Sequence, residues 1–218
     1  MASSPLSEDP GTRAALLAAA AELFAEQGFR ATRVREIVAR AGANVAAVSY
    51  HFGSKEGLYL AVLQHEAARV IERYPISRPE HARDAAAALR DVVAGLLGRF
   101  LAADARSYAP RLLIREMLNP TSALAQVVEQ VTRPQFEQVF AVVAAILGPR
   151  VPPEQVRVCA FSVVGQCMFY LVARPVVERL APGVLDAVQR EALTDSIVAL
   201  SLAGLQARRH QYEEVAHA

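Results

Sequence analysis

Residues 28–55, GFRATRVREIVARAGANVAAVSYHFGSK, decide the fold of this chain. Two short helical patterns stand on either side of the turn Ala41-Gly42-Ala43. The stretch holds five basic residues and one acidic residue, Glu36, whereas the whole chain of 218 residues has a formal net charge of only +1. The bases are Arg30, Arg33, Arg35, Arg40 and Lys55. A helix, a tight turn, a second helix and a local excess of positive charge are typical of a DNA-binding helix-turn-helix.

The composition indicates an all-α protein. Hydrophobic residues make up 53% of the chain, and most of them are alanine, leucine and valine. Alternating strand patterns are absent. A chain of this length can bury roughly 70% of its unfolded surface without metals or disulfides. Cys159 and Cys167 fall in one helical pattern, roughly 12 Å apart along its axis, which is too far for a bridge and favours a reducing compartment.

The chain has no pattern that predicts export or a membrane span. Its beginning, MASSPLSEDPG, lacks a cationic start followed by an apolar run. No uninterrupted apolar run reaches the roughly 18 residues that a span needs. We therefore expect a soluble, cytoplasmic protein with no membrane partner.

The first part of the chain predicts a disordered tail over residues 1–10 and a helix-turn-helix domain over residues 11–74. An amphipathic helix begins at Gly11 and ends at Gly28. Three further helices follow, and the fourth runs to about Tyr74. We expect their N-caps at Thr32, Asn44 and Ser54.

Residues 75–218 predict a larger helical domain that begins at the proline-rich break 75–79. Ser77 and Glu80 have the spacing of a capping box for a helix that reaches about residue 103. Pro134 should kink or split a longer pattern over residues 120–147. The remaining expectations are a helix ending at residues 119–120, a turn over 148–153, a helix over 154–173, an irregular connector over 174–183 and a last helix over 185–209.

Residues 11–64 resemble the N-terminal domain of the TetR family of transcriptional regulators. The resemblance rests on ALLAAAAELFAEQGFRATRVREIVARAGANVAAVSYHFGSKEGLY, and above all on Tyr50-His51-Phe52 followed by Ser54-Lys55-Glu56. Further along, ARSYAPRLLIREMLNPTSALAQVVEQVTRPQFE resembles the C-terminal domain of CecR-type members. The resemblance implies a non-enzymatic regulator with a DNA-binding domain, a helical domain for a small-molecule effector, and a dimer.

The resemblance also implies roles in DNA binding for individual residues. It assigns base-facing positions to Asn44, Val45, Ala46, Ala47 and Tyr50, and phosphate contacts to Thr32, Tyr50, His51 and Lys55. Many members carry Ser, Lys, Gly and Thr where this chain has residues 44–47. Valine and alanine cannot form hydrogen bonds to bases, so readout should depend on Asn44, Ser49 and contacts with thymine methyl groups. Arg33 then becomes the best candidate for a guanine contact.

The larger domain should supply the dimer interface and the effector site. A C2 dimer suits a palindromic DNA site, and small residues would let the last helices approach closely. Ordinary monomer core explains part of the same apolar pattern. The expected interface residues are Phe161, Val164, Met168, Ile197, Leu200, Ser201, Gly204 and Leu205. The expected effector residues are Phe100, Tyr108, Leu112, Arg115, Met117, Phe136, Phe140, Gln166, Phe169 and Tyr170, although residues of these types at such positions are more often core than ligand contacts.

Arg115-Glu116 lies within an apolar helix and allows two readings: an internal ion pair that holds helices together, or a group that pairs with an anionic effector. No catalytic constellation stands out. The five histidines show no metal-ligand spacing, so we expect no metal and no cofactor.

The principal hypothesis is therefore a ligand-responsive regulator, acting as a repressor, that binds a palindromic operator as a homodimer and is released by a small apolar or amphiphilic effector. The alternative is a helical ligand-binding or scaffold protein whose helix-turn-helix has lost DNA binding, which the apolar run Val45-Ala46-Ala47 would favour. A helical enzyme is the least supported reading.

Overall fold

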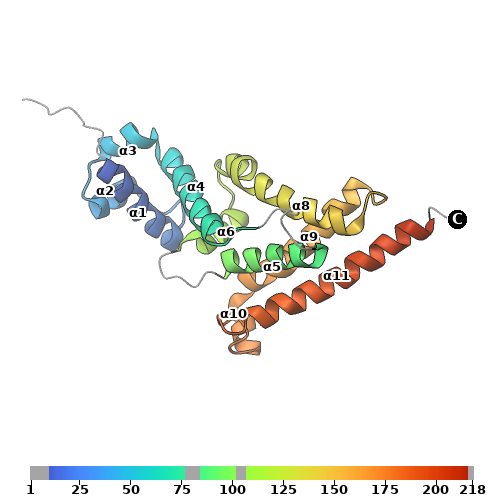
Figure 1. Cartoon of the computed structure of the whole chain (residues 1–218). Coiled ribbons are helices and arrows are strands. Elements are labelled where there is room, and N and C mark those ends of the chain that lie inside the picture. The colour runs from blue at the N-terminus through green and yellow to red at the C-terminus, as the bar shows by residue number, and fades with distance from the viewer. Residues whose placement is uncertain (1–9, 77–83, 102–106, 216–218) are drawn as a thin grey trace, which may run out of the picture. The chain divides into compact units, whose positions relative to one another are not determined.

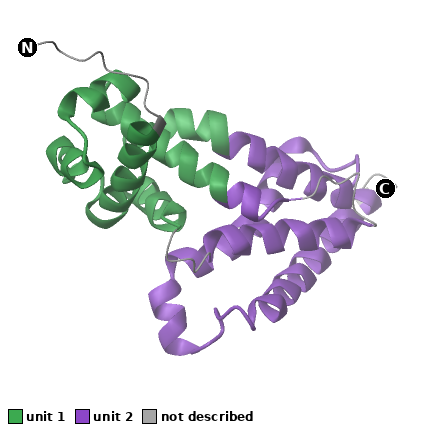
Figure 2. Ribbon diagram, turned by 60° about the vertical axis from the view of Figure 1, so that its left-hand side comes forward, with its two compact units in different colours: residues 1–69, 105–131 green, residues 70–104, 132–218 purple. Residues whose placement is uncertain are grey.

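The computed structural model describes residues 10–76, 84–101 and 107–215, and every regular element within them is helical. The all-α prediction is therefore confirmed. The chain divides into two compact units (Figure 2): unit 1 combines residues 1–69 with 105–131, and unit 2 combines residues 70–104 with 132–218. The predicted domains were consecutive, whereas residues 105–131 pack with the N-terminal helices.

Unit 1 is built on four N-terminal helices and a later pair (Figure 1). They are α1 (Pro10–Gln27), α2 (Val34–Ala41), α3 (Val45–Phe52), the larger part of α4 (Lys55–Arg73), α6 (Ala109–Leu118) and α7 (Leu124–Val127). One apolar cluster joins them, and it includes Phe24 of α1, Ile37 of α2, Leu58 of α4 and Leu112 of α6, all at most 1% exposed. The core of the helix-turn-helix is thus completed by a helix that follows it by more than 50 residues.

Local signals fix the ends of the first helices where the sequence predicts them. Gly28 has a φ of +83°, and its N–H donates to the carbonyl of Phe24 at 2.9 Å, which ends α1. The side chain of Asn44 accepts from the N–H of Ala47 at 2.9 Å and caps α3. The hydroxyl of Ser54 accepts from the N–H of Gly57 at 3.1 Å and caps α4.

The predicted N-cap of α2 was wrong by one residue. Arg33, not Thr32, occupies the cap, and its backbone N–H donates to Oε2 of Glu36 at 3.0 Å. Thr32 is only 1% exposed. Its hydroxyl donates to the carbonyl oxygen of Gly28 at 2.8 Å, and it also lies 3.3 Å from the carbonyl oxygen of Leu23. The hydroxyl thus serves the end of α1 rather than the start of α2.

Unit 2 consists of packed helices with an apolar core. They are α5 (Ala85–Phe100), α8 (Arg133–Leu147), α9 (Pro153–Val172), α10 (Arg174–Leu180) and α11 (Arg190–Val215). Helices α5, α8, α9 and α11 contact one another (Figure 1). Leu97, Val142, Ala160 and Ile197, one from each of these helices, are at most 3% exposed.

The later helices follow the sequence prediction with two differences. The pattern over residues 120–147 is split, as predicted, into α7, a π-helix η2 (Val128–Thr132) and α8, with Pro134 in the first turn of α8. The prediction of an irregular connector over residues 174–183 was wrong, because helix α10 forms there with Pro175 in its first turn. Helix α11 begins five residues later than predicted, at Arg190. The predicted capping box at Ser77 and Glu80 lies outside the described residues.

Helix α9 is long and apolar enough to cross a membrane by length and composition, with a mean hydropathy of 1.4, but only 28% of that window is buried in the protein. A single helix of this kind is weak evidence for a membrane, because an apolar helix that packs against other helices meets the same criteria. The apolar side chains it leaves exposed are Val158, Phe161, Phe169 and Val172.

Candidate nucleic-acid interface

Helix α3 presents one side to solvent and buries the other. Val45 and Tyr50 are each 50% exposed, and Asn44, Ala46 and Ser49 are exposed with them. Ala47 and Val48 are 5% and 2% exposed and belong to the core of unit 1. The prediction that Ala47 faces bases is therefore corrected: its methyl group packs inward, because position 47 lies on the buried face of the helix.

Few of the exposed α3 side chains can form hydrogen bonds to bases. The Oδ1 of Asn44 is used by the cap, which leaves the two N–H donors of its amide for DNA. Ser49 and Tyr50 add hydroxyl groups, whereas Val45 and Ala46 offer only apolar contact. The structure thus keeps Asn44, Val45, Ala46, Ser49 and Tyr50 together on one exposed face.

Arg33 lies exposed at the N-terminal end of α2, and its guanidinium has no hydrogen bond or ion pair with the described residues. Arg40, at the other end of the same helix, pairs with Glu22 of α1 at 2.5 Å. The two arginines therefore differ in what they can offer a nucleic acid: one charge is available, and the other is already paired.

Lys55 is held in place at the start of α4. Its Nζ lies 4.4 Å from the centre of the Phe29 ring, an attractive cation–π arrangement. Phe29 in turn packs against Phe24 and Tyr59 of the core, with ring centres 6.0 and 4.9 Å away. The ammonium group is thus positioned by the core rather than left on a freely moving side chain.

The same end of α4 favours negative charge. The pKa of Glu56 is lowered, first by a hydrogen bond from its own backbone N–H and second by the Ser54 hydroxyl. Exposed N–H groups at the start of a helix stabilise anions in this way. Lys55 and the first turn of α4 are therefore suited to a phosphate group.

Three further residues have predicted phosphate contacts: Tyr50 and His51 lie together on α3, whereas Thr32 lies in the interior. The rings of Tyr50 and His51 meet edge-on with centres 4.9 Å apart, and His51 is half-buried. Phe52 packs against the core, and its ring lies 5.2 Å from the guanidinium of Arg13. The Thr32 side chain faces the interior, so its predicted contact with phosphate is corrected.

Arg115 and Glu116 support the helix-turn-helix from α6, and sequence analysis did not predict how. The Nε and Nη2 atoms of Arg115 donate to the carbonyls of Ala25 and Glu26 at 2.9 and 2.5 Å. These carbonyls belong to the last turn of α1. Arg115 thus supplies donors to carbonyls that have no partner within their own helix, and its contact with an effector stays a prediction.

Glu116 is 3% exposed and accepts hydrogen bonds from two partners. The Tyr59 hydroxyl donates to it at 2.9 Å, and the backbone N–H of Thr121 donates at 2.8 Å. Burial, and then the hydrogen bond to Glu116, raise the pKa of Tyr59. Each residue of Arg115-Glu116 has a structural role, as the structural reading expects, but the two bind separate partners rather than each other.

The other predicted effector residues of unit 1 differ in how far they are exposed. Leu112 is 1% exposed within the core, and Tyr108 packs against the same core. Met117 is 48% exposed. The Leu112 side chain thus fills the space between helices, and its contact with an effector stays a prediction.

In unit 2 the predicted effector residues have other partners. Phe100 is 8% exposed. Phe136 stacks on Phe161 with ring centres 4.4 Å apart, and Phe140 lies 5.5 Å from the guanidinium of Arg157. Gln166 donates to the Ser201 hydroxyl at 2.9 Å. Phe169, 56% exposed, meets Tyr170 edge-on.

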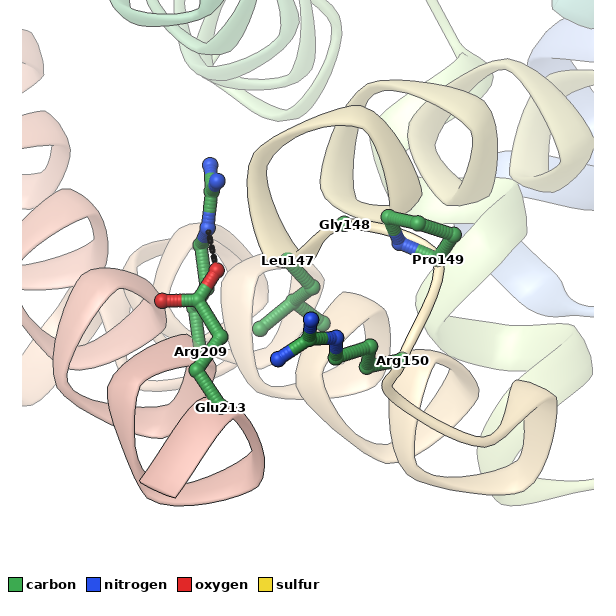
Figure 3. Close-up of a pocket in the computed structure, with 6 residues that line it drawn as sticks. All are labelled: Leu147, Gly148, Pro149, Arg150, Arg209 and Glu213. Atoms are coloured by element: carbon green, nitrogen blue, oxygen red, sulfur yellow. Dashed lines mark hydrogen bonds and ion pairs between the residues drawn. The ribbon is translucent and has the colours of Figure 1, made fainter. Parts of the chain in front are cut away.

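Two pockets of unit 2 lie on α11, away from those residues. One of about 400 Å³ is formed by the turn after α8 and the end of α11, where Arg209 donates to Glu213 at 2.7 Å (Figure 3). The other, of about 250 Å³, is lined by residues of α5, α8 and α11. Neither is lined by a predicted effector residue.

The predicted dimer residues divide into two groups. Phe161 and Leu200 are 60% and 71% exposed, Gly204 is exposed, and Val164 and Met168 are half-buried. Ile197, Ser201 and Leu205 are 3%, 7% and 4% exposed. The last three are corrected, because they face the core of their own unit. No cluster of three or more His, Cys, Asp or Glu side chains that could hold a metal occurs in the described parts of the chain.

Comparison with known proteins identifies the family. A profile described as "Bacterial regulatory proteins, tetR family" matches residues 16–62. A second, described as "HTH-type transcriptional dual regulator CecR, C-terminal domain", matches residues 85–205, which is more than half of the chain. The chain belongs to the TetR family. It is 31% identical over 210 residues to the HTH-type transcriptional dual regulator CecR of Shigella flexneri, with 88% of this chain and 92% of the relative covered.

Solved structures of TetR-family size share the fold. The regulator FadR from Bacillus subtilis, in complex with stearoyl-CoA, matches with a TM-score of 0.66 at 15% identity, covering 88% of this chain and 96% of that one. A putative regulator from Saccharomonospora viridis, in complex with choline, matches with a TM-score of 0.63 at 15% identity, covering 87% and 96%. The chain is therefore a DNA-binding transcriptional regulator with a CecR-type C-terminal domain, in a family of regulators rather than enzymes.

Proposed function

We propose that this TetR-family regulator acts as a cytoplasmic, ligand-responsive repressor that binds a palindromic operator as a homodimer. The observation that carries the proposal is the exposed face of α3, together with Lys55, which is positioned by Phe29, and with Arg33, whose guanidinium has no partner in the described parts of the chain. The α3 residues face the bases, and Arg33 reads guanine. Tyr50, His51 and Lys55 bind phosphates.

Exposed apolar side chains of unit 2 support the homodimer. Phe161 and Phe169 of α9 and Leu200 of α11 are more than half exposed. Exposed apolar side chains that recur along one long helix mark interaction surfaces. A second copy of this chain would cover them and place two α3 helices on one palindromic site.

The effector is a small apolar or amphiphilic molecule that prefers the state unable to bind DNA. Relatives of the same fold bind stearoyl-CoA and choline, so the family fold accepts both large and small effectors. The CecR relative of Shigella flexneri is named a dual regulator. Repression is the simpler outcome, because a dimer on two successive major grooves blocks other proteins from that DNA.

Fluorescence anisotropy with duplexes from the region upstream of the chain's own gene tests DNA binding. We expect Arg33→Ala and Lys55→Ala each to weaken binding by about tenfold or more. Lys55→Ala should also reduce the slope of log affinity against log salt concentration by about 1, as the loss of one phosphate contact would. Arg40→Ala is the matched control, because it removes the same charge from a residue already paired with Glu22.

If Lys55→Ala and Arg33→Ala bind as the wild type does, the assignment of these residues is wrong. If the wild type binds no upstream duplex at low salt, the operator proposal fails, and the reading of a helix-turn-helix that has lost DNA binding gains support. A transcriptional reporter then gives the sign of regulation: deletion of the gene should raise expression from the bound promoter.

A further inference from the structure

Arg99 is a basic residue at a buried helix end. It stands in the last turn of α5, within the sequence Leu96-Leu97-Gly98-Arg99-Phe100, and is only 7% exposed. Its neighbours Leu97 and Phe100 are 0% and 8% exposed. Arginine is almost never this buried unless it is paired.

Among the residues that the structure describes, Arg99 has neutral hydrogen-bond partners only. Its Nε donates to the backbone carbonyl of Tyr74 at 2.8 Å, and its Nη1 donates to the side-chain oxygen of Gln135 at 2.9 Å. Its Nη2 is buried without a hydrogen-bond partner. Arg90, which precedes Arg99 on α5, differs in having acidic partners, because it pairs with both Glu191 and Asp195.

Within the described part of unit 2, this arrangement leaves the charge without a counter-ion. Burial lowers the pKa of the Arg99 guanidinium to about 10, so the group remains protonated at pH 7. A buried charge is costly unless an opposite charge and hydrogen bonds compensate it. A carboxylate suits this need, since it accepts short, charge-assisted hydrogen bonds from a guanidinium.

We propose that Arg99 is the recognition group for the effector, and that the effector is a small organic anion with an apolar body whose carboxylate binds Nη2. The proposal rests on the proposed ligand-responsive function and names the chemical class of its effector. The apolar body is inferred from the burial of Leu97 and Phe100, the residues that neighbour Arg99 in the sequence of α5. A cation would meet repulsion at this position.

The partners of Arg99 give binding a route to regulation. Tyr74 directly follows α4, and Gln135 lies in the first turn of α8. The chain passes from unit 1 to unit 2 within α4, between residues 69 and 70, and again just before α8, between residues 131 and 132. An anion that draws the guanidinium toward itself weakens its hold on both segments. These are the segments that lead to the DNA-binding unit.

Isothermal titration calorimetry with a series of n-alkyl carboxylates, from butanoate to dodecanoate, tests the proposal against the 1-alkanols of the same chain lengths. Each pair has the same apolar body and differs in charge. At least one carboxylate should bind the wild type about tenfold or more tighter than its alcohol, since a hydrogen bond to a charged group is worth that much. If no carboxylate binds more tightly than its alcohol, the proposal is overturned.

The variant Arg99→Gln tests whether Arg99 causes the tighter binding of the carboxylate than of its alcohol. Arg90→Gln is the matched control on the same helix. Arg99→Gln should lose the preference for the carboxylate, whereas Arg90→Gln should keep it. Equal preference in Arg99→Gln and the wild type overturns the assignment. The comparison of acids with alcohols needs only the wild-type chain, so the proposal stays testable even if Arg99→Gln does not fold.

Anisotropy on the same preparations separates this inference from the proposed function. Intact operator binding without any carboxylate preference overturns the role of Arg99 alone. Absence of operator binding by the wild type instead defeats the proposed function.

Discussion

The Nε of Arg115 on α6 donates a hydrogen bond of 2.9 Å to the carbonyl oxygen of Ala25 in the last turn of α1. Ninety residues of sequence separate the two. The same guanidinium lies against Gly28, where an added Cβ would come within 3.0 Å of Nη1. The end of α1 and the turn that leads to α2 are therefore held by a helix outside the predicted DNA-binding domain.

Gly28→Ala should destabilise the protein more than Gly42→Ala. Both glycines have positive φ angles, +83° and +64°, so each substitution should cost about 1 kcal/mol of backbone strain. Only at Gly28 would the new methyl group also displace Arg115, since nothing lies within 4 Å of the Cβ position at Gly42. Urea unfolding measures both changes.

A double-mutant cycle isolates the contact with Arg115. In an Arg115→Met background, the excess cost of Gly28→Ala over Gly42→Ala should fall, because the rigid guanidinium is gone. An excess that is unchanged in this background would show that the strain arises elsewhere in the turn.

Tyr59→Phe should lower the free energy of unfolding by about 1–3 kcal/mol, because it removes one of the donors to the buried carboxylate of Glu116. Chemical denaturation at pH 7 measures the change. Tyr212→Phe, in the last turns of α11, is the control, and its effect should be much smaller.

Tyr59 should also make stability fall at alkaline pH. Its pKa is raised in the folded state, whereas an unfolded tyrosine titrates near pH 10. The stabilisation is therefore fully present below about pH 10 and is lost as the pH rises from there through the folded pKa. The difference in melting temperature between the wild type and Tyr59→Phe should begin to shrink above about pH 10; a constant difference would contradict the linkage.

Thr32→Val should destabilise unit 1, and Thr32→Ser should preserve most of its stability. Valine keeps the shape of the side chain but removes the hydroxyl that donates to Gly28 at 2.8 Å, at a cost of about 1–2 kcal/mol. Serine keeps the donor. At a temperature where both variants are folded, both should bind operator DNA with wild-type affinity. A weakening of more than about tenfold would restore the predicted phosphate contact.

Phe161→Glu should convert the proposed dimer into monomers. Phe161 is 60% exposed on α9, and a buried, unpaired carboxylate at an interface is strongly unfavourable. Size-exclusion chromatography with light scattering measures the molar mass. Val188→Glu is the matched control, because Val188 is 86% exposed but lies outside α9 and α11. A monomeric wild type, or a dimeric Phe161→Glu variant, would contradict the proposed interface.

The sequence predicts those features of this fold that depend on neighbouring residues. Asn44, Ser54 and Gly28 act as caps because each bonds within four residues along the chain. Thr32 misled the prediction because two acceptors compete for one hydroxyl, and the carbonyl of Gly28 prevails over the start of α2.

Features that depend on distant residues could not be predicted in the same way. Glu116 meets Tyr59 across 57 positions, and no local pattern connects them. The exposed and buried faces of α11 also escaped prediction, because Ile197, Ser201 and Leu205 follow the same helical spacing that an interface would show. The sequence around Arg99 did indicate an unusual position, because it places a single charge next to the buried residues Leu96, Leu97 and Phe100.

Unit 1 is formed from two separate segments of the sequence, and this limits how such regulators can recombine their domains. Leu112 belongs to the same core as α1 and α4, and Arg115 and Glu116 form hydrogen bonds with these two helices, although residues 70–104 of the other unit intervene in the sequence. A single recombination event near residue 75 would therefore join two halves of one core that had separate histories. A functional chimera requires a second crossover after residue 131, so that α6 is inherited together with the helices it supports.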